Sequence, residues 1–226
     1  MPPLHFGGHE FLVADRALFW PRHAALIVAD LHLEKSSWFA MRGQMLPPLD
    51  SLATLDDIAR LVEATGAATL WCLGDNFHDS RGSERMTTPV RARLDELTHR
   101  LDWRWIVGNH DPDLPPGIGG TVIEEAEVEG LVLRHRAEPD ERRPELSGHF
   151  HPKHRPLRSG GRPCFVTTRS KLILPAFGAF TGGLAADHPE ITRACGEAGE
   201  ALIPAAGRLL RFPLARELRE RRLVRG

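Results

Sequence analysis

Three apolar runs in the first half of the chain share one pattern. Each is continuous, lacks alternation and ends abruptly in polar residues. They cover residues 24–32 (AALIVADLH), 68–76 (ATLWCLGDN) and 103–111 (WRWIVGNHD). Runs of this length are typical of strands buried on both faces, in a sheet that helices cover. We therefore predict a buried strand in each run.

Two segments between these runs have the period of an amphipathic helix. Apolar residues recur there at intervals of three and four: Leu52, Leu55, Ala59 and Val62 in the first, and Val90, Leu94, Leu97 and Leu101 in the second. The order strand, helix, strand, helix, strand indicates βαβ units, which make parallel strands. The carboxyl ends of such strands gather at one edge of the sheet, where ligands of open α/β folds usually bind.

The second half of the chain predicts mostly strands. After a Pro/Gly loop at 112–120, residues 121–135 (TVIEEAEVEGLVLRH) indicate two short strands that turn near Glu129 and Gly130, and the second ends at His135. Further strands are expected in 162–170 and 171–177. We predict an α/β fold with βαβ units first and a β-rich second half.

Polar residues follow the predicted strands at positions that face one edge. Asp30, His32, Asp75, Asn109 and His110 follow the first three, and His135, His149 and His151 follow later apolar runs. Carboxylate, imidazole and amide oxygen together form a mixed ligand set that suits Mn²⁺, Fe or Zn²⁺. If the segment at His149 and His151 loops around the ions, each ring can serve a different metal. We expect a metal site at this edge.

Composition limits the other possibilities. The 226 residues are 42% hydrophobic, and we expect one domain over residues 1–226. The formal net charge of −1 gives no global attraction to nucleic acid or membrane. No stretch approaches the roughly 20 apolar residues of a membrane span, and the start lacks a signal-peptide pattern. Three cysteines without a C-x-x-C pair suit a reducing compartment, so we expect a cytoplasmic protein.

The motifs resemble those of the calcineurin-like metallophosphoesterases. They are D-x-H at Asp30 and His32, G-D at Gly74 and Asp75, G-N-H-D at 108–111, a strand-ending His135, and G-H-x-H at 148–151. This motif core spans residues 24–152. The resemblance implies a sandwich of two mixed β-sheets flanked by helices.

Two further stretches are similar to one bacterial branch of that family, the ligase-associated DNA-damage-response endonucleases. They are LFWPRHAALIVADLHLEKSSWFAMRGQMLPP and LILPAFGAFTGGL, and they extend the resemblance to residues 18–184. The branch implies a Mn-dependent DNA phosphodiesterase in DNA repair. It also implies DNA as the substrate and a functional association with an ATP-dependent DNA ligase, a helicase and an exonuclease.

The resemblance also implies how the ligands divide. Asp30, His32, Asp75 and His151 would hold one divalent ion, and Asp75, Asn109, His135 and His149 the other. Two such ions lower the pKa of a bridging water, provide a hydroxide to attack phosphorus and neutralise charge on the phosphoryl oxygens. Mn is the expected metal, with Fe or Zn as alternatives.

Other residues near the motifs carry weaker expectations. By the same resemblance His110 faces the substrate and assists the leaving group, and Asp111 either orients the His110 ring or serves as a turn residue before Pro112. His78, Lys35 and Arg42 are candidates for substrate binding, although loop or solvated helix positions explain them equally well. The basic segment 207–226 either contacts DNA or, as is more common, forms a solvated helix.

Alternative functions remain open at this point. A phosphomonoesterase on the same fold is one, but protein phosphatases of the family carry an arginine four residues after the G-D aspartate. Here that position is Asp79, and Arg81 comes two residues later. A small cyclic-nucleotide phosphodiesterase and a non-catalytic, metal-stabilised binding module are the others. The chain lacks the phosphate-loop pattern G-x-x-x-x-G-K-[ST] and a G-x-G-x-x-G after the first buried strand.

Overall fold

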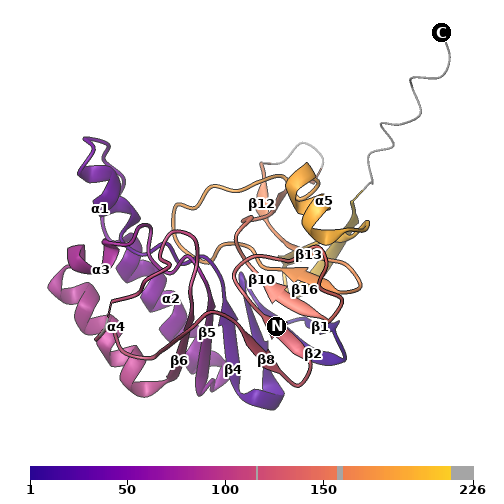
Figure 1. The fold of residues 1–226 in the computed structure, drawn as a ribbon, viewed down its shortest axis with the longest axis horizontal. Helices are drawn as coiled ribbons and strands as arrows, with labels where there is room; N and C mark the ends of the chain where they lie inside the picture. Colours follow the sequence, from indigo (N-terminus) through magenta and orange to yellow (C-terminus); the bar gives the residue numbers. More distant parts are fainter. Residues whose placement is uncertain (116, 157–159, 215–226) are drawn as a thin grey trace, which may run out of the picture.

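Two β-sheets packed face to face form the centre of the molecule, and helices cover the outer face of each sheet (Figure 1). The computed structural model describes residues 1–115, 117–156 and 160–214. Helices α2 (Asp50–Thr65) and α4 (Thr88–Arg100) lie against the first sheet, and α5 (Pro189–Cys195) lies against the second. The order of layers is helices, sheet, sheet, helix, which is the predicted sandwich of two mixed sheets.

The first sheet has its strands in chain order, from β1 to β7. They are β1 (Pro3–Phe6), β2 (His9–Ala14), β3 (Ala17–Trp20), β4 (Ala25–Val28), β5 (Thr69–Leu73), β6 (Asp102–Ile106) and β7 (Thr121–Ile123). The pairs from β1 to β4 are antiparallel and those from β4 to β7 are parallel. The three predicted buried strands and their βαβ connections are confirmed.

Side chains of β4 alternate between two different cores. Leu26 and Val28 pack under the helices, whereas Ala25 and Ile27 pack between the two sheets. Successive side chains of a strand point to opposite faces, so a strand between two apolar layers needs an apolar residue at every position. This requirement explains why the first three runs lack alternation.

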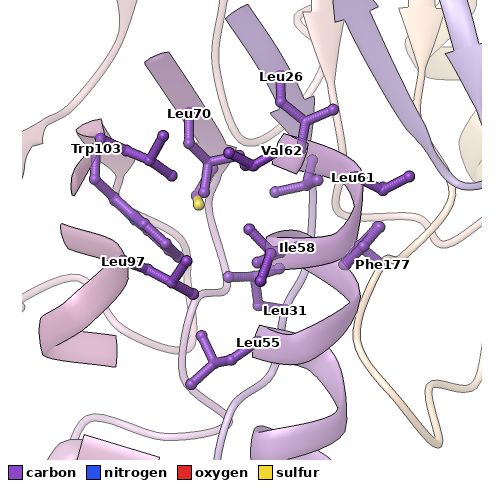
Figure 2. Packing of buried hydrophobic residues seen from close by; sticks show 14 of the residues in the cluster. Leu26, Leu31, Leu55, Ile58, Leu61, Val62, Leu70, Leu97, Trp103 and Phe177 are labelled. Carbon is purple, nitrogen blue, oxygen red and sulfur yellow. The ribbon is translucent and has the colours of Figure 1, made fainter. Parts of the chain in front are cut away.

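The two predicted helical stripes are also confirmed. Helix α2 (Asp50–Thr65) and helix α4 (Thr88–Arg100) pack against each other and against the sheet. In Figure 2, Leu55, Ile58 and Val62 of α2 meet Leu97 of α4 and Trp103 of β6. Two short helices complete this side, α1 (Lys35–Ala40) and α3 (Gly82–Arg85), whereas a 3-10 turn (Pro21–His23) between β3 and β4 pairs with Glu129 of the second sheet's hairpin.

The second sheet has the order β16, β15, β13, β14, β10, β9, β8. Its strands are β8 (Ala126–Val128), β9 (Leu131–Leu133), β10 (Glu145–Ser147), β13 (Phe165–Thr167), β14 (Lys171–Ile173), β15 (Glu200–Ala205) and β16 (Arg208–Pro213). Strands β9, β10 and β14 are parallel, and the other pairs are antiparallel. A separate two-stranded sheet pairs β11 (Lys153–His154) with β12 (Arg162–Pro163).

The structure corrects one prediction of strands. Residues 121–135 form three strands, not two: β7 joins the first sheet, and β8 and β9 form a hairpin of the second around Glu129 and Gly130. The chain therefore crosses between the sheets at residues 124–125. The buried face changes where the chain passes from one sheet to the other. The sequence pattern does not show this change, so β7 and β8 were predicted as one strand.

Two further observations concern the cysteines and the length of the helices. Cys72, Cys164 and Cys195 are buried free thiols, and burial raises the pKa of Cys164 and of Cys195 to about 12. Within residues 1–115, 117–156 and 160–214, no helix is long and apolar enough to cross a membrane.

A buried ion pair ties the second sheet to the loop between β9 and β10. Lys171 and Glu145 are both almost fully buried, with Nζ 3.2 Å from Oε1. The ammonium also donates to the carbonyl oxygens of Glu138 and Glu141, at 2.6 and 2.7 Å. Removing one partner of such a pair leaves a buried charge without compensation.

We therefore expect Lys171→Met to lower the free energy of unfolding by about 1–3 kcal/mol, because two buried carbonyl oxygens lose their donor and Glu145 keeps only Arg134, 3.6 Å away, as a cationic partner. Urea unfolding followed by circular dichroism measures this. Arg169→Met, an exposed position in the same hairpin, is the control and should change stability by no more than about 0.5 kcal/mol. Equal stability of the two variants would contradict this account of the pair.

Candidate metal centre

The carboxyl ends of strands from both sheets converge on one cluster of polar side chains. Asp30 and His32 follow β4, Asp75 follows β5, and Asn109 and His110 follow β6, all from the first sheet. From the second sheet, His135 follows β9, and His149 and His151 follow β10. The structure thus brings together all seven predicted ligands and His110.

Left-handed backbone is concentrated at this edge. The residues with positive φ include Asp30 (54°), His32 (44°), Asp75 (47°), His149 (72°) and His151 (48°). Each such conformation costs roughly 1–3 kcal/mol in a residue with a side chain. Backbone hydrogen bonds between the loops hold this geometry, among them His32 N to Asp75 O at 2.9 Å and Asp30 N to Gly74 O at 3.2 Å. The G-H-x-H segment loops, as expected.

One group of donor atoms comes from Asp30, His32, Asp75 and His151, and these atoms lie within 4.8 Å of one another. His32 Nε2 is 3.2 Å from His151 Nε2 and 3.8 Å from Asp75 Oδ2. His151 Nε2 is 3.5 Å from Asp30 Oδ1. Two imidazole nitrogens and two carboxylates therefore converge on one small volume.

A second group forms around His135. Its Nδ1 lies 3.0 Å from the carbonyl oxygen of Leu73, which only accepts, so in the neutral ring Nδ1 carries the proton and Nε2 a lone pair. That Nε2 is 3.0 Å from Asn109 Oδ1, 3.1 Å from His149 Nδ1 and 3.3 Å from Asp75 Oδ1. Lone pairs that face one another at these distances need a cation among them, so this donor set fits a divalent metal ion.

Asp75 belongs to both groups. Its Oδ2 faces His32 and its Oδ1 faces His135. The side chain is almost fully buried, and burial, together with the neighbouring Asp30, raises the pKa of Asp75. Burial without a cation thus disfavours the charged form that the geometry of the two groups requires.

Burial also keeps the rings of His32 and His149 neutral. It is the largest cause of the low pKa values of His32, about 2, and of His149, about 4, and repulsion from neighbouring basic side chains lowers both further. A neutral imidazole is the form that binds a metal ion. These two rings therefore present lone pairs, not protons, to a cation near neutral pH.

Two glycines of the motifs allow the close approach of the loops. A Cβ at Gly108 would lie 2.3 Å from Asp75 Oδ1, and a Cβ at Gly148 would lie 2.5 Å from Asp30 Oδ2. Any side chain there would displace the carboxylate that the loop packs against. This explains the glycines of G-N-H-D and G-H-x-H in physical terms.

His110 lies beside Asp75 and remains partly open to solvent. Its Nδ1 is 2.8 Å from the carbonyl oxygen of His78, so Nδ1 is the protonated nitrogen and donates. Its Nε2 is 3.9 Å from Asp75 Oδ2, and 41% of the side chain is exposed. The free nitrogen of the ring thus faces the centre from its open side.

Asp111 has partners other than the expected ones. Oδ2 accepts from the backbone N–H of Asn76 at 2.8 Å and of Phe77 at 3.0 Å, and Oδ1 accepts from that of Gly108 at 3.1 Å. The side chain is almost fully buried and joins the loops after β5 and β6. The expectation that Asp111 orients the His110 ring is wrong for this geometry, because His78 holds that ring nitrogen.

The three weaker candidates lie in helix α1 or next to it. They are His78, Lys35 and Arg42. The His78 ring packs on Trp38, with 4.9 Å between centroids, and on His110, with 5.6 Å; burial lowers the pKa of His78 to about 4. Lys35 begins α1, and the Arg42 guanidinium lies 3.5 Å from the centroid of the Trp38 ring. Trp38 was not predicted as a functional residue, because in the sequence it resembles an ordinary apolar residue of a helix.

Sequence analysis also missed Asn76, although it directly follows the G-D motif. Its Nδ2 donates to Ile106 O at 2.9 Å, which links the loop after β5 to β6. Asp79, in the position where protein phosphatases of the family carry arginine, forms an ion pair with Arg85. Arg81 is largely exposed and pairs with Glu84 at 2.9 Å.

Part of the basic segment 207–226 lies outside the described residues, namely 215–226. The part before it belongs to β16, where Arg211 pairs with Glu200. The predicted helix is therefore wrong for residues 208–213, and both possibilities stay predictions for residues 215–226.

Comparisons with known proteins agree with this architecture. Residues 24–173 match the family model of the calcineurin-like phosphoesterases. The crystal structure of the nuclease MPE from Pseudomonas putida is similar, with a TM-score of 0.73 and 30% sequence identity, over 93% of this chain and 98% of that one. Yfce, a phosphoesterase from E. coli, aligns over 84% of this chain and 99% of its own at 15% identity and a TM-score of 0.39. No curated protein matches the chain.

We expect Asp111→Asn to lower the free energy of unfolding by about 1–3 kcal/mol, because an amide has only one accepting atom and its NH₂ would meet a backbone N–H. It should also weaken metal binding, since the two joined loops carry Asp75 and Asn109. Urea unfolding and the Mn content of the dialysed protein measure these effects. Asp113→Asn, exposed in the same turn, is the control, and identical behaviour of the two would refute this role.

Proposed function

Because the chain belongs to the calcineurin-like phosphoesterase family, we propose that it is a two-metal phosphodiesterase that cleaves nucleic acid. Family membership makes it a metal-dependent phosphoesterase, and the site carries groups that fit metal ions. The number of ions, the substrate and the residue roles are the proposal.

The observation that carries the proposal is the shared carboxylate of Asp75. Each of its oxygens faces a separate group of converging donors. We assign Asp30, His32, Asp75 and His151 to one ion and Asp75, Asn109, His135 and His149 to the other. When bound, two divalent ions supply an activated water and neutralise charge on the phosphoryl oxygens.

The chain's own residues complete the chemistry. In its protonated form, His110 donates a proton from Nε2 to the leaving oxygen, while its Nδ1–H remains bonded to the carbonyl of His78. That bond fixes the ring with Nε2 toward the centre. Asp111 acts at a distance by holding the two loops together, and we assign it a positioning role.

The comparisons favour a nucleic-acid substrate, and among nucleic acids we propose DNA. The similar Pseudomonas putida structure is that of a nuclease, and the resemblance of residues 18–184 to the ligase-associated branch supports an endonuclease of DNA repair. The mixed O/N donor set is compatible with Mn²⁺, which we propose as the metal. A cytoplasmic location and an association with ligase, helicase and exonuclease rest on the sequence alone.

The alternatives make different demands on the site. A protein phosphatase of this family would use an arginine at the position of Asp79, which here forms an ion pair with Arg85. A non-catalytic binding module would have no use for the side chain of His110, because the bond of this residue to Asp75 comes from its backbone N–H. We therefore favour a diesterase and distinguish cyclic nucleotides from polynucleotides by experiment.

Nicking of covalently closed supercoiled plasmid by metal-stripped protein reloaded with Mn²⁺ tests the proposed function. We expect conversion to the open circular form, dependent on Mn²⁺. Absence of nicking together with Mn²⁺-dependent hydrolysis of bis(p-nitrophenyl) phosphate would keep the diesterase and reject DNA. Hydrolysis of neither substrate would reject the proposal as a whole.

Asp75→Asn should lower the metal content of the protein from two ions to one or none and reduce hydrolysis at least about 100-fold, because one amide oxygen cannot bridge two cations. Elemental analysis after dialysis and plasmid nicking measure the two effects. Asp79→Asn is the matched control, four residues further along the same loop. An active Asp75→Asn variant with full metal content would refute the bridging assignment.

His110→Ala should keep its metal ions and lose rate, by roughly 100- to 10,000-fold for a poor leaving group. The loss should be much smaller on bis(p-nitrophenyl) phosphate, whose leaving group needs no proton. Comparing kcat on the two substrates checks this, and loss of metal by the variant would instead make His110 a ligand.

A further inference from the structure

Helix α1 and the turn that follows it carry two cations and two aromatic rings. Lys35, Trp38 and Phe39 belong to the helix, and Arg42 lies in the turn, with its guanidinium against the Trp38 ring. We call these residues the α1 face. Cations interleaved with aromatic rings are the combination that binds nucleic-acid strands through phosphates and bases.

The α1 face touches the proposed catalytic residue through His78. The Trp38 ring meets the His78 ring edge to face at 4.9 Å, and the Phe39 ring stacks on it at 5.9 Å. On its other side His78 stacks on His110 at 5.6 Å, and His110 Nε2 lies 3.9 Å from Asp75. The face is therefore next to the place where the leaving group of the substrate would lie.

Arg42 is held against Trp38 and remains exposed. Its guanidinium lies 3.5 Å from the centroid of the Trp38 ring, and Nη1 donates to the carbonyl oxygen of Trp38 at 3.1 Å. The residue is exposed, so a ligand can reach the guanidinium while Trp38 supports it. An ordered guanidinium plane is a surface on which a nucleobase stacks.

Lys35 supplies a positive charge without a close countercharge. Among the described residues, no carboxylate lies within 4 Å of its ammonium. It is half-buried, and both burial and the nearby Lys153 lower its pKa, while Asp50 acts in the opposite direction. Lys35, which acts electrostatically on His32, therefore adds positive potential at the edge of the site.

We propose that the α1 face holds the nucleotide next to the scissile phosphate of the nucleic-acid substrate. Arg42, backed by Trp38, stacks on the base, and Lys35 contacts the adjoining phosphate. This inference rests on the proposed function, because it needs a polynucleotide in the site. The α1 face would make a nucleic-acid strand a better substrate than a small phosphodiester.

Binding of fluorescent oligonucleotides to the full, metal-stripped chain tests the stacking directly, because nothing is cleaved. A 12-nucleotide thymidine strand and a 12-residue abasic strand carry the same charge, so their difference in Kd measures the contribution of the bases. We expect wild type to prefer the thymidine strand by about 10-fold or more. Arg42→Ala should reduce this preference to about 2-fold, and Trp38→Phe should retain most of it.

Lys35→Ala should weaken the binding of both strands by a similar factor, about 5-fold at low salt, and flatten the salt dependence of Kd. Arg60→Ala, an exposed arginine of α2 paired with Asp57, is the control for loss of one positive charge and should match wild type. With Mn²⁺-loaded enzyme, Arg42→Ala and Lys35→Ala should lower kcat/KM at least 10-fold more on the oligonucleotide than on bis(p-nitrophenyl) phosphate.

The outcomes separate the two claims. Equal affinity of wild type for the thymidine and abasic strands, or variants that match Arg60→Ala, would overturn the α1 face and leave the phosphodiesterase intact. Failure of loaded wild type to hydrolyse either substrate would overturn the proposed function, and the α1 face with it. Trp38→Ala serves as a second test of the stack, provided that its circular dichroism spectrum matches that of wild type.

Discussion

The rest of the site depends on the convergence of lone pairs around one buried carboxylate. Asp75 presents each of its oxygens to a different pair of imidazoles, and the proton of His135 is committed to the carbonyl of Leu73. Low dielectric surroundings make such an arrangement unfavourable for a protein alone. A divalent cation among these donors makes the arrangement favourable, which fits the metal centre of the phosphoesterase family.

The two sheets share the work of building this centre. The parallel strands β4, β5 and β6 end side by side and deliver the carboxylates, while β9 and β10 of the second sheet bring imidazoles from the opposite side. Left-handed backbone at Asp30 and Asp75 turns these side chains inward, and the carboxylate of Asp111 bridges the loops that carry Asp75 and Asn109. The strands thus hold the strained loops in place, and the strained residues are those of the candidate metal centre.

Much of this was predictable from the sequence because the first sheet is buried on both faces. Such strands appear as continuous apolar runs, so Asp30, Asp75 and Asn109 stood out as the first polar residues at a common edge. His135 and His149 were expected at the same edge because they follow later apolar runs, but the division of the ligands between two ions came through the resemblance. The sequence left the role of Asp111 open because two of its partners, Asn76 and Phe77, lie about 35 residues away and meet it only in the folded chain. The strands β1 to β3 were missed although Gly7 and Gly8 form a recognisable turn signal between the first two.

The central claim is that one carboxylate joins two cations, and electron paramagnetic resonance of the Mn²⁺-loaded protein tests it most directly. Two Mn²⁺ ions bridged by Asp75 are close enough to couple magnetically, at about 3.5–4 Å in two-metal sites of this kind. The account predicts that a stepwise titration ends at two ions per chain with the broadened spectrum of a coupled pair. Saturation at one ion, or an uncoupled six-line spectrum at two, would contradict it.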